Sequence, residues 1–397
     1  MGVGSGAVGR WTRVFTVDSA LGFVALAALV AVDASRFELA LVGVCWFLLP
    51  MVFGMAYVLL PPYVGRTFRP AWLPGLHVAA ALAGTGGLVW WGVFDGAWWA
   101  GRFGLFAWTI GVLCFSVGLG RLAVPAVRER AQIRFRDGDN PQRSTRLATA
   151  LLPVGLSALL GATLWLAGRA SSPTGFRLAF PAAVHGMAAG FAALLVFALG
   201  VRLLRGFFHV DPPRWLEWAV LLPGALGPLL LASQPPGAPG FVAGGALETV
   251  AMLAYLALVS VVAWRTDARR VGLAGIWLGA VSGALATMIA LGAVTGIVSV
   301  VGLLDLHAVL VLQGFFGLTI VGYAFQFFPV TTGRFRGASR RGALTVVALI
   351  ATGLGLRIVA VTPVLAALSA IGGVLGIGGA IGYLWLVGRR LLGDASA

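Results

Sequence analysis

The chain has 397 residues, of which 59% are hydrophobic and only 10% are charged, and its mean hydropathy is +0.96. Soluble domains carry roughly 25% charged residues, so this composition excludes an ordinary soluble protein and predicts an integral membrane protein. The formal net charge of +15 comes from arginines in short loops between apolar runs, a distribution that argues against a nucleic-acid partner. Cys45 and Cys114 lie inside apolar runs, so neither a disulfide framework nor a cysteine-based metal site is expected.

The apolar runs predict an all-α polytopic protein with about twelve transmembrane helices, since about 20 apolar residues are needed to cross a bilayer. The division between the ninth and tenth helices has the weakest signal, because residues 293–304 are themselves apolar. The predicted spans are 14–34, 38–62, 72–93, 103–126, 147–168, 179–204, 216–233, 241–264, 271–293, 302–329, 342–361 and 364–388.

The arginines predict how the chain lies in the membrane. With twelve helices, seven arginine-containing segments fall on one side, at residues 10–13, 66–69, 128–146, 202–214, 265–270, 334–341 and 389–390. The other side carries far fewer arginines: Arg36, Arg102, Arg169 and Arg177. The positive-inside rule therefore predicts a multi-pass protein of the cell membrane, with both termini in the cytoplasm and the lipid bilayer as its first partner.

A short motif recurs at the ends of the second and tenth helices. Gly54 and Pro61 are 7 residues apart, as are Gly322 and Pro329, and a Gly-Arg pair follows each proline. A proline followed by glycine can end a helix, so this motif predicts a helix exit rather than a catalytic feature.

The sixth helix shares a second register with the tenth. His185 precedes Gly200 by 15 residues, just as His307 precedes Gly322 by 15, and Leu39 has this place in the second helix. Helices 2, 6 and 10 therefore predict three parallel four-helix units, at about 1–146, 147–270 and 271–397, within one transmembrane domain of residues 1–397. Such units would pack around a pseudo-threefold axis.

His185 and His307 are the candidate cofactor or metal ligands. An ionisable side chain within a membrane span is expensive and often functional, and neutral imidazole is a common ligand of metals and haem. The alternative is a histidine that hydrogen-bonds to a neighbouring helix, which is the role we expect for His77. We expect His209 in an interfacial loop.

Four further polar residues are candidates for proton transfer or for supporting these histidines. Asp305 lies two residues before His307, and Glu248 lies in the outer part of the eighth helix. Gln313 and Tyr323 follow His307 in the tenth helix. The alternatives are interfacial solvation for the two carboxylates, and for Glu38, and hydrogen bonds between helices for Gln313 and Tyr323.

The tenth helix also carries a family resemblance. The stretch His307-Ala-Val-Leu-Val-Leu-Gln-Gly-Phe-Phe-Gly-Leu-Thr-Ile-Val-Gly is similar to the H-A-H-x-x-x-x-G-x-x-G-x-x-x-x-G style of that helix in the haem-copper oxidase subunit I superfamily. The chain also resembles the NnrS family of twelve-helix, haem- and copper-containing proteins linked to nitric oxide stress. The resemblance implies haem, with copper as a second cofactor, and a redox partner or another membrane subunit.

The ligand set implied by this resemblance is incomplete. Leu39 stands where a low-spin haem ligand would be expected, and Asp305 or Val309 replaces the second histidine of the tenth helix. The resemblance therefore implies a degenerate member that lacks a full oxygen-reducing centre and binds haem or another metal at His307 and His185. Such a protein would sense, scavenge or turn over nitric oxide or oxygen, or pass electrons. The alternatives are a transporter or channel of three parallel repeats, and a cofactor-free structural subunit.

Overall fold

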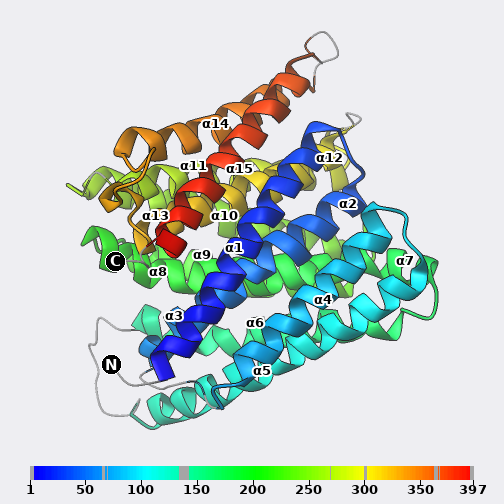
Figure 1. Ribbon diagram of the computed structural model, residues 1–397, viewed down its shortest axis with the longest axis horizontal. Coiled ribbons are helices and arrows are strands. Elements are labelled where there is room, and N and C mark those ends of the chain that lie inside the picture. Colours follow the sequence, from blue (N-terminus) through cyan, green and yellow to red (C-terminus); the bar gives the residue numbers. More distant parts are fainter. Residues whose placement is uncertain are drawn as a thin grey trace. The chain divides into compact units, whose positions relative to one another are not determined.

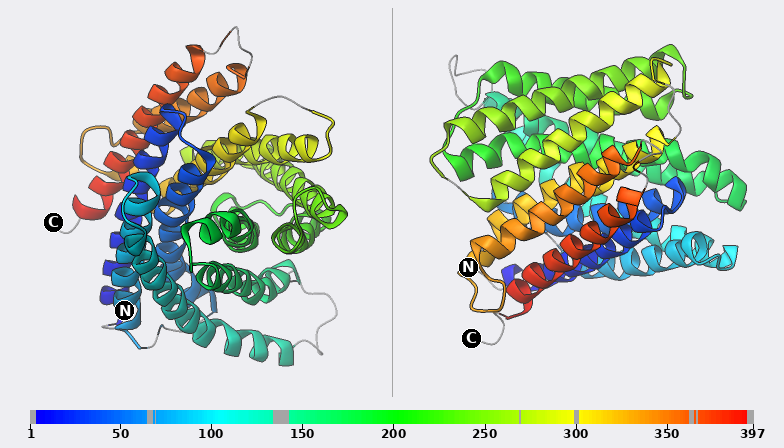
Figure 2. Two further views of the ribbon diagram at one scale, coloured as in Figure 1. Left: turned by 90° about the vertical axis from the view of Figure 1, so that its right-hand side faces the viewer. Right: turned by 90° about the horizontal axis from the view of Figure 1, so that it is seen from above.

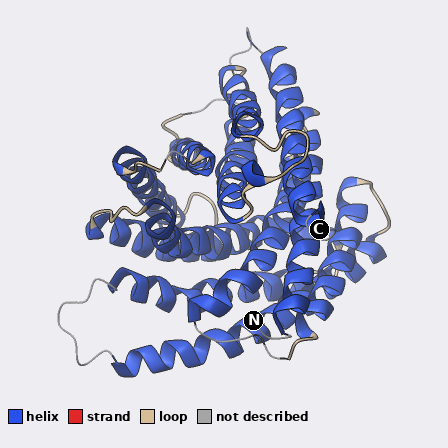
Figure 3. Ribbon diagram, turned by 60° about the vertical axis from the view of Figure 1, so that its left-hand side comes forward, coloured by secondary structure: helices blue, strands red, loops and turns tan. Residues whose placement is uncertain are grey.

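The computed structural model describes residues 4–64, 68, 70–133, 143–268, 270–298, 302–361, 365 and 367–393. These residues form helices joined by short connections, and no strand occurs among them (Figure 3). The predicted all-α class is therefore confirmed.

Twelve helical spans are long and apolar enough to cross a membrane, which confirms the predicted number. The ninth and tenth are separate, because α11 ends at Val294 and α12 begins after Gly302, whose φ of 84° suits glycine. The helices, most of them labelled in Figure 1, are α1 (Gly4–Ala31), α2 (Arg36–Ala40), η1 (Leu41–Leu48), α3 (Leu49–Val64), α4 (Leu73–Val93), α5 (Trp98–Ile133), α6 (Arg143–Gly168), α7 (Pro173–Val184), η2 (His185–Ala193), α8 (Leu194–Phe208), α9 (Arg214–Ser233), α10 (Pro239–Arg265), α11 (Val271–Val294), α12 (Leu303–Val309), η3 (Leu310–Leu318), α13 (Thr319–Phe327), η4 (Val330–Thr332), α14 (Arg340–Val359) and α15 (Ala367–Gly393).

The second, sixth and tenth spans differ from the others in two ways. Each contains a π-helical stretch, η1, η2 or η3, which begins within three residues of the register position shared by Leu39, His185 and His307. Each is also more buried: 78, 78 and 83% of its most apolar stretch is buried, against 33–56% in the other nine. π-Helical turns are rare and often mark functional sites, so these spans are where a site is expected.

The helix ends differ from the prediction at two places. Pro61 lies inside α3, which continues to Val64, so this proline does not end its helix as predicted; Gly65 and Arg66 lie outside the described residues. Pro329 follows the end of α13, as predicted. The connection predicted at 128–146 is shorter, because α5 reaches Ile133 and α6 begins at Arg143.

The chain divides into two compact units, and the three predicted repeat units stay a prediction. The first unit comprises residues 1–16, 49–203 and 217–247. In it α4 and α5 approach closely through glycine. A Cβ on Gly84 would lie 2.6 Å from the backbone nitrogen of Trp108, and one on Gly87 would lie 2.7 Å from the Cα of Gly104. Small residues of this kind let membrane helices pack backbone to backbone.

The second unit comprises residues 17–48, 204–216 and 248–397. Here three glycines on α11 face the backbone of η3 and α13: Gly272, Gly275 and Gly279. One turn further, Gly283 faces the side chains of Phe315 and Met252. The hairpin of α14 and α15 is built in the same way, with Gly353 against Gly372 and Gly376 (Figure 2). Close packing along both helix pairs sets the position of the residues in η3.

Candidate functional site

His185 begins the π-helical stretch η2 in the first unit. Its Nδ1 lies 2.8 Å from the carbonyl oxygen of Pro181, one turn earlier in the same span. A carbonyl can only accept, so Nδ1 carries the proton and the neutral ring keeps its lone pair on Nε2. The ring is half-buried and meets Phe241 edge-on, with 6.2 Å between ring centroids.

His307 lies in α12, three residues before η3, in the second unit. Its Nδ1 lies 2.9 Å from the carbonyl oxygen of Ala286 on α11, and its ring is half-buried. The same reasoning gives the same tautomer, with the lone pair on Nε2. In metal-binding histidines the second nitrogen is usually held in this way by a carbonyl or carboxylate. The structure thus gives both candidate histidines the tautomer that a ligand needs.

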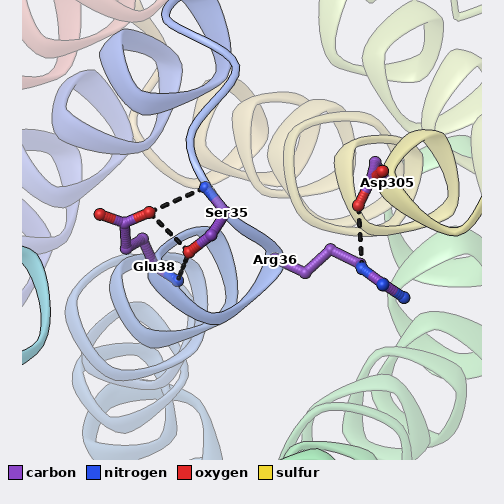
Figure 4. Close-up of polar contacts among 4 residues, drawn as sticks. All are labelled: Ser35, Arg36, Glu38 and Asp305. Atoms are coloured by element: carbon purple, nitrogen blue, oxygen red, sulfur yellow. Dashed lines mark hydrogen bonds and ion pairs between the residues drawn. The ribbon is translucent and has the colours of Figure 1, made fainter. Parts of the chain in front are cut away.

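Asp305 does not have the role next to His307 that its position in the sequence had suggested. Its carboxylate pairs with Arg36 on α2, at 2.9 Å, and both side chains are more than half exposed (Figure 4). The proton on His307 Nδ1 goes to a backbone carbonyl, so Ala286 fixes the tautomer.

Glu38 has a local structural role. The backbone N–H and the hydroxyl of Ser35 donate to its carboxylate at 2.8 and 2.5 Å, and the backbone N–H of Glu38 donates back to the hydroxyl at 3.3 Å (Figure 4). This capping box closes the N-terminus of α2.

Glu248 is buried in α10, and its Oε1 has no hydrogen-bond partner among the described residues. Tyr255 lies seven residues further along, on the same face of α10, because seven residues are close to two full turns. Its hydroxyl is 3.5 Å from that of Tyr323 on α13. One turn beyond Tyr323, the buried Gln326 receives a hydrogen bond of 3.5 Å from Arg270. The second unit thus carries a series of polar side chains along α10 and α13.

Gln313 does not belong to this polar series and lies next to α15 instead. It is buried in η3, and a Cβ on Gly376 of α15 would lie 2.5 Å from its Nε2. The side chain therefore packs between helices, which agrees with the alternative reading of this residue.

Asp18 is a carboxylate within the first span that was not among the residues predicted from the sequence. Asp18 of α1 accepts a hydrogen bond of 3.1 Å from the indole of Trp46, and the next residue, Ser19, donates to the carbonyl of Phe47 at 2.6 Å. Both partners lie in η1, so α1 supports that π-helical stretch. The available signal was an aspartate inside an apolar run, where acidic side chains are rare and informative.

His77 and Tyr57 form a polar pair inside the first unit. The tyrosine hydroxyl lies 2.8 Å from Nδ1 of the fully buried imidazole. The ring centroids of Phe15, Phe53 and Phe115 lie 4.9, 4.6 and 5.4 Å from that of His77. This hydrogen bond between helices α3 and α4 is the structural role expected for His77. His209 is exposed at the end of α8, with a φ of 54°.

The candidate ligands fit haem better than copper, the two cofactors that the family resemblance implies. Within the described parts of the chain, no group of three or more His, Cys, Asp or Glu side chains could hold a metal ion. The described residues therefore offer no set of three such ligands for a copper ion. An axial haem ligand needs one imidazole with a fixed tautomer, which His185 and His307 each supply.

Comparison with known proteins supports the fold. No protein-family model matches the chain, and neither does any curated protein. Among solved structures, a haem-copper terminal oxidase dimer determined by cryo-EM is similar, with a TM-score of 0.70 and 12% sequence identity. The match covers 99% of this chain and 84% of that chain. At this identity the likeness shows the fold alone: the chain is a multi-pass membrane protein with a haem-copper oxidase-like fold.

Proposed function

We propose that the protein is an integral membrane haem protein in which His307, His185 or both supply an axial ligand. The observation that carries this proposal is the shared tautomer of two histidines that begin, or closely precede, the π-helical stretches of deeply buried spans. The haem-copper oxidase-like fold supports it.

The chain's own part in this function is to hold the imidazoles. The carbonyls of Ala286 and Pro181 keep the proton on Nδ1 and make Nε2 a better donor. Haem held by one of these histidines would supply an iron that can bind a diatomic gas such as nitric oxide or oxygen. Electron transfer with a redox partner or another membrane subunit is the other use of such a site. No copper centre is part of the proposal.

The test is the visible spectrum of protein purified from cells supplied with haem. We expect a Soret band, and its loss or shift in His307→Ala, His185→Ala or the double variant. His209→Ala is the matched control, because His209 is an exposed loop residue. A change of the band with carbon monoxide would report binding of a gas at the iron. Absence of the band from the wild type, or an unchanged band in the double variant, would overturn the proposal.

A second candidate, proton-coupled transport, is favoured by the polar series along α10 and α13. Protons can pass along buried carboxylates and hydroxyls that water connects, and Glu248 has a carboxylate oxygen without a partner among the described residues. We expect proton flux into proteoliposomes that falls strongly in Glu248→Gln. Glu38→Gln is the control, because that carboxylate caps α2. Equal flux in wild type and Glu248→Gln would exclude this candidate.

A further inference from the structure

Five exposed arginines gather at one end of the α14–α15 hairpin. We call them the basic surface: Arg334, Arg336, Arg340, Arg341 and Arg389. All five belong to the second compact unit. They lie at the ends of membrane-crossing helices, on the side that the positive-inside rule assigns to the cytoplasm.

The contacts between α14 and α15 show that these arginines are neighbours. A Cβ on Gly379 would lie 2.5 Å from Ile350, and one on Gly382 would lie 2.8 Å from Val346. Going from Ile350 back to Val346 on α14 thus corresponds to going from Gly379 forward to Gly382 on α15, which means that the two helices run antiparallel. The antiparallel pair therefore brings the start of α14, at Arg340, level with Arg389.

The loop before α14 is fixed to α15 by an aromatic side chain. The indole of Trp385 donates to the carbonyl oxygen of Arg336 at 2.9 Å, and the guanidinium of Arg389 lies 5.5 Å from the centre of the Trp385 ring. Gly337, with a φ of 90°, lets the loop turn at this point. Trp385 is itself half exposed, as is common for tryptophan at the level of lipid headgroups.

The charge of the basic surface is not balanced by ion pairs within the part of the chain that the structure describes. None of its five arginines pairs with a carboxylate of the described residues, whereas Arg205 pairs with Asp211, and Arg357 with Asp33. Two arginines in the first turn of α14 also add positive charge to the positive end of the helix dipole, which is unfavourable without an anion nearby.

We propose that the basic surface binds the phosphate headgroup of an anionic phospholipid. Trp385 would then lie beside the part of the lipid's acyl chains that is closest to the headgroup. Clusters of arginine next to membrane helices attract anionic lipids, and each guanidinium can donate two hydrogen bonds to phosphate. The proposal is independent of haem binding, because it uses neither His185 nor His307 nor the carbonyl groups that hold them.

The test is native mass spectrometry of the full chain in detergent, titrated with phosphatidylglycerol or with phosphatidylcholine of the same acyl chains. We expect preferential binding of phosphatidylglycerol. Its affinity should fall by at least about tenfold when Arg336, Arg340, Arg341 and Arg389 are all changed to glutamine. Changing the same four to lysine should restore part of the binding, because the charge returns without the planar guanidinium.

The matched control removes the same charge elsewhere, by changing Arg10, Arg13, Arg214 and Arg265 to glutamine. It should bind phosphatidylglycerol as the wild type does. Trp385→Phe, which keeps every arginine, should weaken binding because the loop loses its indole hydrogen bond. Equal binding of the two lipids, equal loss in the control variant, or full competition by inorganic phosphate would each overturn a lipid site at this surface.

Discussion

At the scale of single residues, the interior of this protein depends on a few polar side chains that find partners far from water. The Tyr57 hydroxyl and His77 Nδ1 are 2.8 Å apart inside a shell of phenyl rings. A buried polar group that loses its partner has no water to replace it, so the partner's loss carries the full desolvation penalty. This makes the pair a sensitive point in the first unit.

We predict that Tyr57→Phe lowers the free energy of unfolding by about 1–3 kcal/mol, because it leaves His77 Nδ1 without its hydrogen bond. Tyr383→Phe is the matched control: that tyrosine is also fully buried, but its hydroxyl has no partner among the described residues. Thermal unfolding of both variants in detergent would measure the difference. Equal melting temperatures for the two would show that the pair contributes nothing beyond packing.

The candidate residues could be found from the sequence, but most of their partners could not. His185 and His307 follow from one shared register, and Pro181 is one turn from His185. Ala286, however, is 21 residues from His307 and offers only a backbone carbonyl, which no side-chain pattern reveals. Asp305 shows the opposite error. Its nearness to His307 in the sequence suggested that the two interact, but in the fold its carboxylate pairs with Arg36.

At the scale of elements, the close helix pairs rest on glycine. A Cβ on Gly279 of α11 would lie 2.9 Å from the backbone nitrogen of Thr319 and 3.0 Å from the carbonyl oxygen of Phe315, so α11 and the η3–α13 segment would have to separate. On α14, a Cβ on Gly355 would meet no heavy atom within 4 Å.

We therefore predict that Gly279→Ala destabilises the protein by about 1–3 kcal/mol, because overpacking forces the helices apart. Gly355→Ala should leave stability unchanged or raise it slightly, since alanine favours the helix. Melting temperatures measured in the same detergent would compare the two. A Gly279→Ala variant as stable as the wild type would mean that α11 shifts at little cost.

The π-helical stretches show where prediction from the sequence ends at this scale. Hydropathy located the second, sixth and tenth spans, because a long enough run of apolar residues is sufficient to predict a membrane-crossing helix. It could not distinguish α- from π-helix in η1, where seven of eight residues are buried and no polar face marks the period. The contacts of this stretch come from residues far away in the sequence: Ser19 donates to the carbonyl oxygen of Phe47, and a Cβ on Gly22 would lie 2.6 Å from the carbonyl oxygen of Trp46.

At the scale of the whole molecule, the fold was largely predictable, because the length and spacing of the apolar runs fix the number of spans. The direction of the spans, which rests on the alternating charge, stays a prediction. Arg357, which the charge comparison did not count, lies at the same end of the second unit as Asp33, with which it pairs, and donates to the carbonyl oxygen of Ser369 at 3.3 Å. The sparse arginines of the predicted outer side thus include two that are bound to carboxylates, Arg36 and Arg357.

This difference between the two sides gives the last prediction, a test of orientation. Single cysteines would replace Arg102 and Arg340 in a chain where Cys45 and Cys114 have become alanine. Both arginines are exposed, and they lie near the starts of the fourth and eleventh spans, which the alternation of spans predicts to begin on opposite sides of the membrane. We expect a membrane-impermeant maleimide to label Arg102→Cys on intact cells, and Arg340→Cys only after permeabilisation, because the arginine-rich side stays in the cytoplasm. Labelling in the reverse order would place the basic surface outside the cell. Labelling of both positions on intact cells would contradict the alternation of the spans between them.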